Sequence, residues 1–307
     1  MQRIFSLTLA TVLASTWAYA QSGANGAEEI GVLKVQGNVY MLFSAAGNVA
    51  AQVGDDGILV VDTGTEALAP KFAAALKRLS NKPISWIVNT SGDLEHIGGN
   101  AALPRLTGLN ERQRARIVAH ENVLNRLSAA PAANRPGVPD ALWPNDEYST
   151  PVKDFSFNGE PVLVYHVPAA RTDGDSLVHF RRSDVLATGD IFTPGRYPII
   201  ALDRGGSIQG LVDALNMVLR ITVPLKYEEG GTYVIPGHGR LCDEADVVEY
   251  RNMVTIVRDR IRDMVVKNMT LEQVKAARPT RDYDTQYDAK DASAFVEAVY
   301  KSFRGSK

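Results

Sequence analysis

The 307-residue chain has little cysteine, little net charge and few long apolar segments. Cys242 is its only cysteine, so an internal disulfide is excluded. The formal net charge is −2 and the acidic and basic residues are interspersed, which argues against a basic surface for nucleic acid. After the first twenty residues, no apolar run is long enough to cross a membrane. With 45% hydrophobic and 22% charged residues, the composition is that of an ordinary globular protein.

The first twenty residues have the layout of a secretory signal peptide. Arg3 supplies a positive charge, residues 4–17 are mostly apolar, and Ala18-Tyr19-Ala20 is a small-x-small cleavage signal. We therefore expect residues 1–20 to be removed and residues 21–30 to form a flexible N-terminus. The mature protein is then periplasmic or secreted. The alternative is an uncleaved membrane anchor.

The first half of the remaining chain is predicted to be strands followed by a helix. Short strands with closely spaced turns are typical of an antiparallel sheet. The predicted strands are 32–35, 39–43, 48–53, 58–62 and 84–88. Between the last two, Leu68, Phe72, Leu76 and Leu79 recur at helical spacing, which predicts a helix over residues 65–79.

The second half repeats this order. Its predicted strands are 162–167, 176–180, 185–187 and 233–235, and its predicted helices are 207–219, 243–266 and 292–303. Asp243 is the expected N-cap of the long helix. Two halves of this kind indicate two sheets packed together with helices outside. Residues 129–150 carry four prolines and little periodicity, so we expect a long loop there, either a connector or a lid.

Polar residues gather where the predicted strands end. The stretches are "VVDTG" with Asp62, "NTSGDLEHIGGN" at 89–100, "TDGDS" at 172–176, "TGD" with Asp190 and "PGHG" with His238. Each stretch contains glycine, which lets backbone and side chains approach a common centre. The sequence therefore predicts one functional site built from several strand ends.

These stretches, in this order, resemble the metallo-β-lactamase superfamily over residues 31–266. The resemblance implies an α/β fold, a four-layer αββα sandwich with a metal site along one edge of its sheets. It also implies one domain over residues 31–307, with C-terminal helices from about residue 243.

The resemblance is incomplete at the metal-binding positions. The family's central motif is His-x-His-x-Asp-His, and the matching positions here are Ser91, Asp93, Glu95 and His96. The family's next histidine ligand is Arg171 in this chain. Its bridging acid and last histidine are matched by Asp190 and His238.

The departures affect the two metal positions differently. Neutral serine is a poor ligand and arginine has no lone pair to offer, so the position made of Ser91, Asp93 and Arg171 is lost as a zinc site. The other position has two histidines and two carboxylates, which suit zinc, and also iron or manganese. Its ligands are expected to be Glu95, His96, Asp190 and His238. Asp62 and Ser91 are expected beside the ligands rather than on the metal.

The first functional hypothesis is an exported hydrolase for a small-molecule substrate. One metal ion at most would activate a water that attacks an amide, lactam, ester or thioester. Asp93 could accept a proton from that water if it is not paired with Arg171. Arg171 could hold a substrate carboxylate or phosphate, or only close the lost site as an ion pair.

The loss of three histidines supports two alternatives. The chain could be a non-catalytic protein that binds a ligand or partner on the same fold. It could also be a metal-independent enzyme that uses Arg171 and the carboxylates for acid–base chemistry. Metal content of the purified protein separates the first hypothesis from both.

Overall fold

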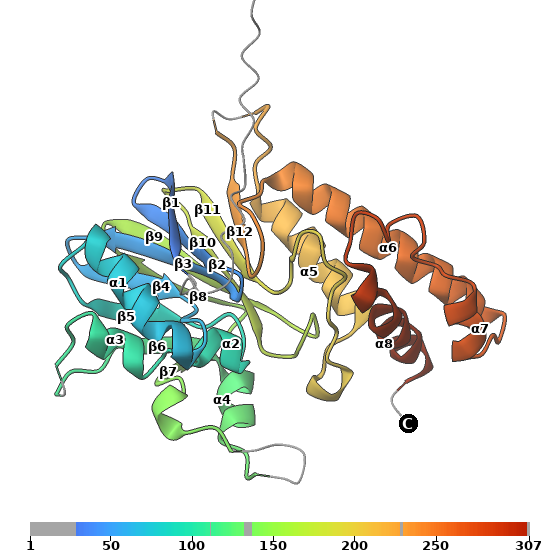
Figure 1. Cartoon of the computed structure of the whole chain (residues 1–307), viewed down its shortest axis with the longest axis horizontal. Helices are drawn as coiled ribbons and strands as arrows, with labels where there is room; N and C mark the ends of the chain where they lie inside the picture. The colour runs from blue at the N-terminus through green and yellow to red at the C-terminus, as the bar shows by residue number, and fades with distance from the viewer. Residues whose placement is uncertain (1–28, 111, 132–136, 228–229, 306–307) are drawn as a thin grey trace, which may run out of the picture.

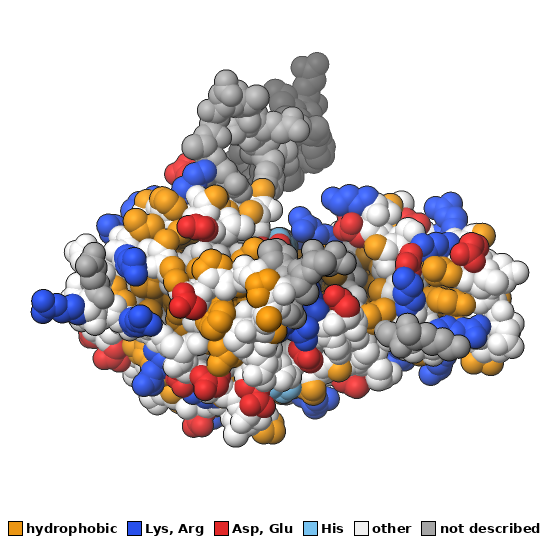
Figure 2. All heavy atoms as spheres, turned by 90° about the horizontal axis from the view of Figure 1, so that it is seen from below, with side chains coloured by type: hydrophobic (Ala, Val, Ile, Leu, Met, Phe, Trp, Pro, Cys, Tyr) orange, Lys and Arg blue, Asp and Glu red, His pale blue; other side chains and the backbone are white. Residues whose placement is uncertain are grey.

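A computed structural model describes residues 29–110, 112–131, 137–227 and 230–305 (Figure 1). The predicted signal peptide at 1–20 and most of the 21–30 segment lie outside the described residues. No helix in the described ranges is long and apolar enough to span a membrane. In Figure 2, positive and negative side chains are intermixed across the face in view, as the low net charge predicts.

The first half of the chain forms a seven-stranded sheet with its strands in sequence order. The strands are β1 (Gly31–Gln36), β2 (Val39–Ser44), β3 (Gly47–Gly54), β4 (Gly57–Val61), β5 (Ile84–Val88), β6 (Arg116–His120) and β7 (Asp146–Tyr148). The first four are antiparallel, as predicted, whereas β4 to β7 are parallel.

The second half forms a five-stranded sheet in the order β12-β11-β10-β9-β8. Its strands are β8 (Val152–Phe157), β9 (Glu160–Val167), β10 (Asp175–Phe180), β11 (Val185–Gly189) and β12 (Tyr233–Pro236). Only β11 and β12 are parallel among its described pairs. The carboxyl ends of β11 and β12 therefore lie at one edge, as do those of β4 and β5.

The helices connect and cover these sheets. The α-helices are α1 (Ala69–Leu79), α2 (Leu94–Ile97), α3 (Ala102–Leu106), α4 (Glu121–Leu127), α5 (Ile208–Ile221), α6 (Glu244–Val266), α7 (Leu271–Ala276) and α8 (Ala292–Arg304). The 3₁₀ turns are η1 (Glu66–Leu68), η2 (Asp140–Leu142), η3 (Leu202–Arg204) and η4 (Ala289–Asp291).

Three large hydrophobic clusters define four layers. One lies between the sheets and includes Met41, Val61 and Val178. A second joins α1 to the outer face of the first sheet, and a third joins α5, α6 and α8 to the second sheet. Figure 1 shows α1 and α5 on opposite sides of the strands. The predicted αββα sandwich is confirmed.

The local signals of the long helices are also confirmed. Ser207 caps α5 through Gly210 N at 2.9 Å, and Asp243 caps α6 in a capping box with Asp246. The predicted loop at 129–150 is wrong in part, because it contains η2 and strand β7. Residues 132–136 of that loop lie outside the described residues.

Candidate metal centre

The functional side chains meet where strands of both sheets end. Asp62 follows β4, the segment from Asn89 to His96 follows β5, Asp190 follows β11 and His238 follows β12. Arg171 lies in the turn between β9 and β10. The predicted convergence of these strand ends is therefore present in the structure.

Asp62 fixes the orientation of His96. Its Oδ2 lies 2.8 Å from Nδ1 of His96 and accepts from the hydroxyl of Thr90 at 2.6 Å, while its Oδ1 accepts from the backbone N–H of Thr90 at 2.8 Å. Nδ1 is thus the donor nitrogen, and Nε2 is left for a metal or an acid. A carboxylate behind a ligating histidine is the usual support of such ligands. Asp62 therefore lies directly behind His96, one of the expected ligands.

A buried polar network holds the backbone of His96. The carbonyl of His96 accepts from Thr63 N at 2.8 Å and from the Thr63 hydroxyl at 3.0 Å. Asn100 accepts from that same hydroxyl at 3.0 Å and exchanges hydrogen bonds with Asn89. These asparagines stand within "NTSGDLEHIGGN", but sequence reasoning gave them no role.

Asp190 lies between the two histidines. Its Oδ2 is 3.3 Å from Nε2 of His96, and its Oδ1 is 3.5 Å from Nε2 of His238. Oε1 of Glu95 is 4.0 Å from Nε2 of His96. Ligand atoms about 2.1 Å from a tetrahedral zinc are separated by about 3.4 Å, so these spacings suit one ion.

The donor atoms fit a metal ion in two further respects. One ligand atom from each of Glu95, Asp190 and His238 lies within 4.8 Å of the others. Nε2 of His96 and Oδ1 of Asp190 are buried and make no hydrogen bond within the described residues, although each faces an ion-pair partner, at 3.3 and 3.5 Å. Buried polar atoms that lack a hydrogen bond are costly, and a bound cation would satisfy them.

Two glycines allow Asp190 to reach this position. A Cβ at Gly237 would lie 2.2 Å from Oδ1 of Asp190, and one at Gly189 would lie 2.4 Å from Oγ1 of Thr90. Gly189 also has φ +50°, a conformation that side chains disfavour. The glycines noted in "TGD" and "PGHG" therefore serve close approach.

Asn48 positions the segment that carries His238, a role that the sequence did not predict. Its side-chain amide donates to the carbonyls of Pro236 and Gly239 at 2.9 and 3.0 Å. Its backbone N–H donates to Gly237 at 2.9 Å. The available signal was a polar residue at the start of the apolar strand β3.

Arg171 occupies the side of the centre where the sequence predicted a lost metal position. Its Nη2 lies 3.4 Å from Oε1 of Glu95 and 3.4 Å from Oδ2 of Asp190, and its Nη1 donates to Asp93. Arg204 donates to the other oxygen of Asp93. Asp93 is therefore held between two guanidinium groups, and Arg204 is a residue that sequence reasoning missed.

The pairing of Asp93 bears on its predicted role. We expected it to accept a proton only if it was not paired with Arg171, and that condition is not met. Burial favours its neutral form, but the two arginines outweigh this and hold the pKa of Asp93 below its usual range. Such a carboxylate is a weak base.

The pKa values of His96 and Asp190 are likewise determined by burial and by neighbouring charges. Burial opposes charge on both, yet the carboxylates of Asp62 and Asp190 raise the pKa of His96 well above its ordinary value. Burial likewise favours neutral Asp190, but His96 and Arg171 lower the pKa of Asp190. Without a metal the centre is thus a set of buried ion pairs, and a metal ion must displace a proton from His96.

The charges of the centre match one divalent cation. The connected side chains comprise four carboxylates and two guanidinium groups, namely Asp62, Asp93, Glu95, Asp190, Arg171 and Arg204. With neutral histidines their net charge is −2. One divalent ion balances this charge, whereas a second would meet Arg171 at close range.

The nearby polar residues have structural contacts. The hydroxyl of Ser91 accepts from the backbone N–H of Asp93 at 3.4 Å. Asp175 accepts from Thr172 N at 2.6 Å, and so fixes its turn. His166 stacks on His120 with ring centroids 3.5 Å apart.

The space beside the centre is small. A cavity of about 10 Å³ lies against Glu95, His96 and His238, with Gly47 and Phe72 among its other walls. That volume holds about one water molecule. Glu95 is the most exposed of the four expected ligands, with 41% of its side chain accessible against 5% for His96.

Solved structures resemble the whole fold at low sequence identity. The stereoselective inverting sec-alkylsulfatase Pisa1 from Pseudomonas sp. has a TM-score of 0.67 and 17% identity, covering 91% of this chain and 51% of its own. The metallo-beta-lactamase from Pontibacter korlensis has a TM-score of 0.57 and 15% identity, covering 74% of this chain and 99% of its own. This chain spans about half the length of the alkylsulfatase. These likenesses show the fold.

Sequence comparison places the chain in a family. No curated protein matches it in sequence. The profile described as "Metallo-beta-lactamase superfamily" matches residues 36–238, which is about two thirds of the chain and includes every expected ligand. The chain therefore belongs to the metallo-β-lactamase superfamily.

Proposed function

We propose that this protein is an exported hydrolase that uses one divalent metal ion, most simply zinc, to cleave an amide, lactam, ester or thioester bond. The observation that carries the proposal is the buried Nε2 of His96, which makes no hydrogen bond within the described residues and faces Asp190 at 3.3 Å, with Glu95 and His238 close by. Such an ion would lower the pKa of a bound water and polarise the scissile carbonyl.

Three side chains position the proposed metal ligands. Asp62 keeps the ring of His96 oriented, and Asn48 keeps His238 in place. Arg171 has only 5% of its side chain accessible, so we assign it the role of holding Glu95 and Asp190 rather than binding substrate. The guanidinium of Arg171 thus neutralises the carboxylates of Glu95 and Asp190, which would otherwise repel one another.

Glu95 is the group proposed to move the proton. Both oxygens of Asp93 accept from arginines, whereas the described contacts of Glu95 involve only Oε1. Oε2 of Glu95 is therefore assigned to accept the proton of the attacking water. The exposure of the Glu95 side chain and the place of this residue on the wall of the small cavity support the assignment.

The proposal is tested by metal content and by hydrolysis of a defined panel. Purified protein is loaded with Zn²⁺, Fe²⁺ or Mn²⁺ and assayed on nitrocefin, p-nitrophenyl acetate, an acyl thioester and a secondary alkyl sulfate. The sulfate is included because the alkylsulfatase fold covers 91% of this chain. We expect metal-dependent hydrolysis of nitrocefin, the acetate ester or the thioester, abolished in Asp190→Asn and His238→Ala. Hydrolysis of the sulfate alone would contradict the proposed substrate class.

A non-catalytic binding protein is the second candidate, favoured by the guanidinium of Arg171 in the lost metal position. It predicts a metal content below 0.1 equivalent per chain and no hydrolysis above that of Asp190→Asn with any loaded ion. Export is tested separately by fractionating cells that express the full chain. Recovery only in the cytoplasm, with residues 1–20 retained, would contradict export.

A further inference from the structure

We propose that the cavity around Arg105, Arg114 and Trp143 is a second binding site, which takes a small organic anion with a flat apolar body. This site goes beyond the hydrolase proposed above, because none of the expected metal ligands lines it. The proposal depends on three properties of the cavity, namely its size, its charge and its apolar walls.

The cavity is large enough for a small molecule. Its volume is about 460 Å³, within the range of roughly 300–1,000 Å³ that ligand sites occupy. One side of its wall is formed by residues between 100 and 109 and between 113 and 117, and the other side by residues between 140 and 145. By contrast, the space beside the metal centre is about 10 Å³.

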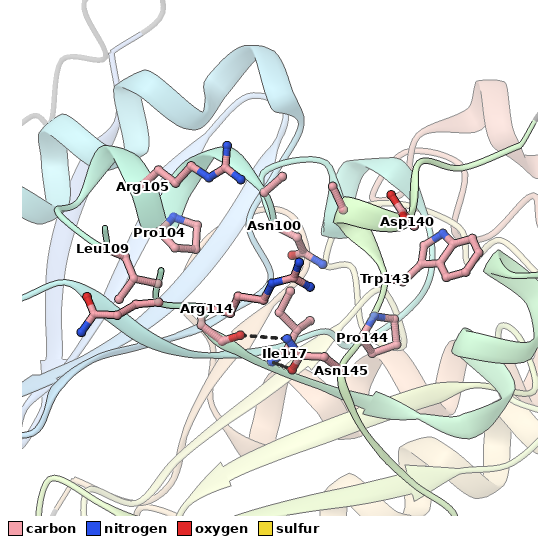
Figure 3. A pocket seen from close by; sticks show the side chains of 14 residues that line it. Asn100, Pro104, Arg105, Leu109, Arg114, Ile117, Asp140, Trp143, Pro144 and Asn145 are labelled. Carbon is pink, nitrogen blue, oxygen red and sulfur yellow. Dashed lines mark hydrogen bonds between the residues drawn. The ribbon is translucent and has the colours of Figure 1, made fainter. Parts of the chain in front are cut away.

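Two arginines give the cavity a positive charge. Figure 3 shows the side chains of Arg105 and Arg114 among those that line it. The carbonyl of Arg105 accepts from Gly108 N at 3.1 Å, but neither guanidinium group makes a hydrogen bond or ion pair within the described residues. Asp140 is the one acidic residue among the lining side chains, so the lining carries a net positive charge. Free guanidinium groups bind carboxylate or phosphate through paired hydrogen bonds.

A fixed indole supplies the apolar surface. Nε1 of Trp143 donates to the carbonyl of Val138 at 2.9 Å, which holds the ring in place. The ring is half-buried, and the buried rings of Pro104 and Pro144 line the same cavity. Leu109 adds a further apolar wall. A flat ring in the ligand could therefore stack on Trp143 while its acid meets an arginine.

The wall of the cavity is rigid where it joins the protein core. Asn100 donates to the carbonyl of Leu142 at 2.8 Å, which ties η2 to the end of the β5–α2 segment. Asn145 accepts from Ile117 N at 2.9 Å and donates to Ala115 at 3.0 Å, as Figure 3 shows. A preformed wall lowers the entropic cost of binding.

The test is calorimetric titration of the full chain with named probes. Benzoate, indole-3-acetate and phenyl phosphate combine an acid with a ring, and the last distinguishes a phosphate from a carboxylate. Acetate has the acid without the ring, and tryptamine has a ring with a positive charge. The titrations are repeated after EDTA treatment, which removes binding of the acid to a metal ion.

We expect saturable binding of the acid-bearing aromatics, at least tenfold tighter than acetate and tryptamine. Arg105→Gln and Arg114→Gln should each weaken it by about tenfold, which corresponds to one charge-assisted pair. Arg112→Gln is the matched control, since Arg112 is exposed, lies on the same segment and does not line the cavity. It should change the affinity less than twofold.

Three results would contradict the proposal of a second binding site. Absence of saturable heat with all three aromatic acids would overturn the proposal. So would equal affinity for acetate and benzoate, or equal effects of Arg112→Gln and Arg114→Gln. All variants are surface substitutions, so unchanged melting temperatures verify that each protein is folded.

Discussion

Nη2 of Arg171 lies 3.4 Å from Oδ2 of Asp190, the same oxygen that lies 3.3 Å from Nε2 of His96. A permanent cation and an expected metal ligand thus share one carboxylate oxygen. The guanidinium stands where a second cation would have to bind. Since like charges repel strongly at this distance in a partly buried site, the contact limits how many ions the centre accepts.

The first prediction is therefore a stoichiometry of at most one tightly bound transition metal per chain. One divalent ion balances the net charge of the centre, and the arginine excludes another. Elemental analysis and native mass spectrometry of the wild-type protein give the number directly. Two equivalents of zinc that survive dialysis would contradict this account of Arg171.

Replacement of Arg171 should alter both stability and stoichiometry. In Arg171→Ala, Asp93 keeps Arg204 but Asp190 loses a counter-charge, so we expect a loss of about 3 kcal/mol near neutral pH. Added zinc should restore part of the loss because it binds only the folded state. Melting curves with and without zinc measure both effects.

The histidine variant tests the same position differently. Arg171→His removes the cation and offers an imidazole, so a weak second metal should bind, although Ser91 contributes no strong ligand. Arg171→Lys is the charge-preserving control and should retain one ion. If neither stability nor metal content differs between wild type, alanine and histidine variants, the guanidinium has no role at the centre.

The third prediction concerns the carboxylate behind His96. Asp62→Asn removes the charge that orients the ring, and should weaken metal binding by roughly 10- to 100-fold. Asp62 has φ +62°, which asparagine tolerates, so the backbone should be kept. Asp184→Asn is the matched control because Asp184 also has a positive φ, of +49°, and lies away from the centre. Competition with a chelating dye measures both affinities.

The fold and most of the centre could be predicted because their signals are local. Apolar strands ending in Asp62, Asp190 and His238 predicted the shared edge, and the helical spacing of Phe72 and Leu76 predicted α1. The helix α2 was not predicted. It has four residues, too few for a periodic pattern to be recognised.

The contacts that were missed join residues far apart in the chain. Arg204 reaches Asp93 across 111 positions, and Asn48 reaches Pro236 across 188. Neither residue lies in a motif, and the one local signal, a polar residue at the start of the apolar strand β3 in the case of Asn48, does not identify the partner. Likewise, the sequence alone did not show whether Asp93 was paired with Arg171, because a paired and an unpaired Asp93 are both compatible with the same residues.

A pair of stacked histidines lies outside the metal centre and provides a test of pH dependence. His120 ends β6, is buried, and packs against His166 at 3.5 Å and against the edge of Tyr148 at 5.2 Å. Its Nδ1 accepts from Asn122 N at 3.3 Å and so caps α4. Protonation of Nδ1 would remove that acceptor.

The last prediction follows from the titration of His120. Burial, and next the electrostatic effect of the neighbouring His166, lower the pKa of His120 to about 4, although Asp173 opposes this. The unfolded chain binds a proton at this residue below about pH 6.5, whereas the folded chain does so only below about pH 4. The stabilisation is therefore complete above pH 6.5 and is lost as pH falls from 6.5 to 4.

In the variant His120→Asn, the asparagine side chain still caps α4 but does not titrate. This variant should be less stable at pH 7 because it loses packing, yet its unfolding free energy should fall less between pH 6.5 and 4, by about 1–3 kcal/mol. Urea unfolding at half-unit pH steps measures the difference, and parallel curves for the two proteins would show that His120 is protonated equally in both states.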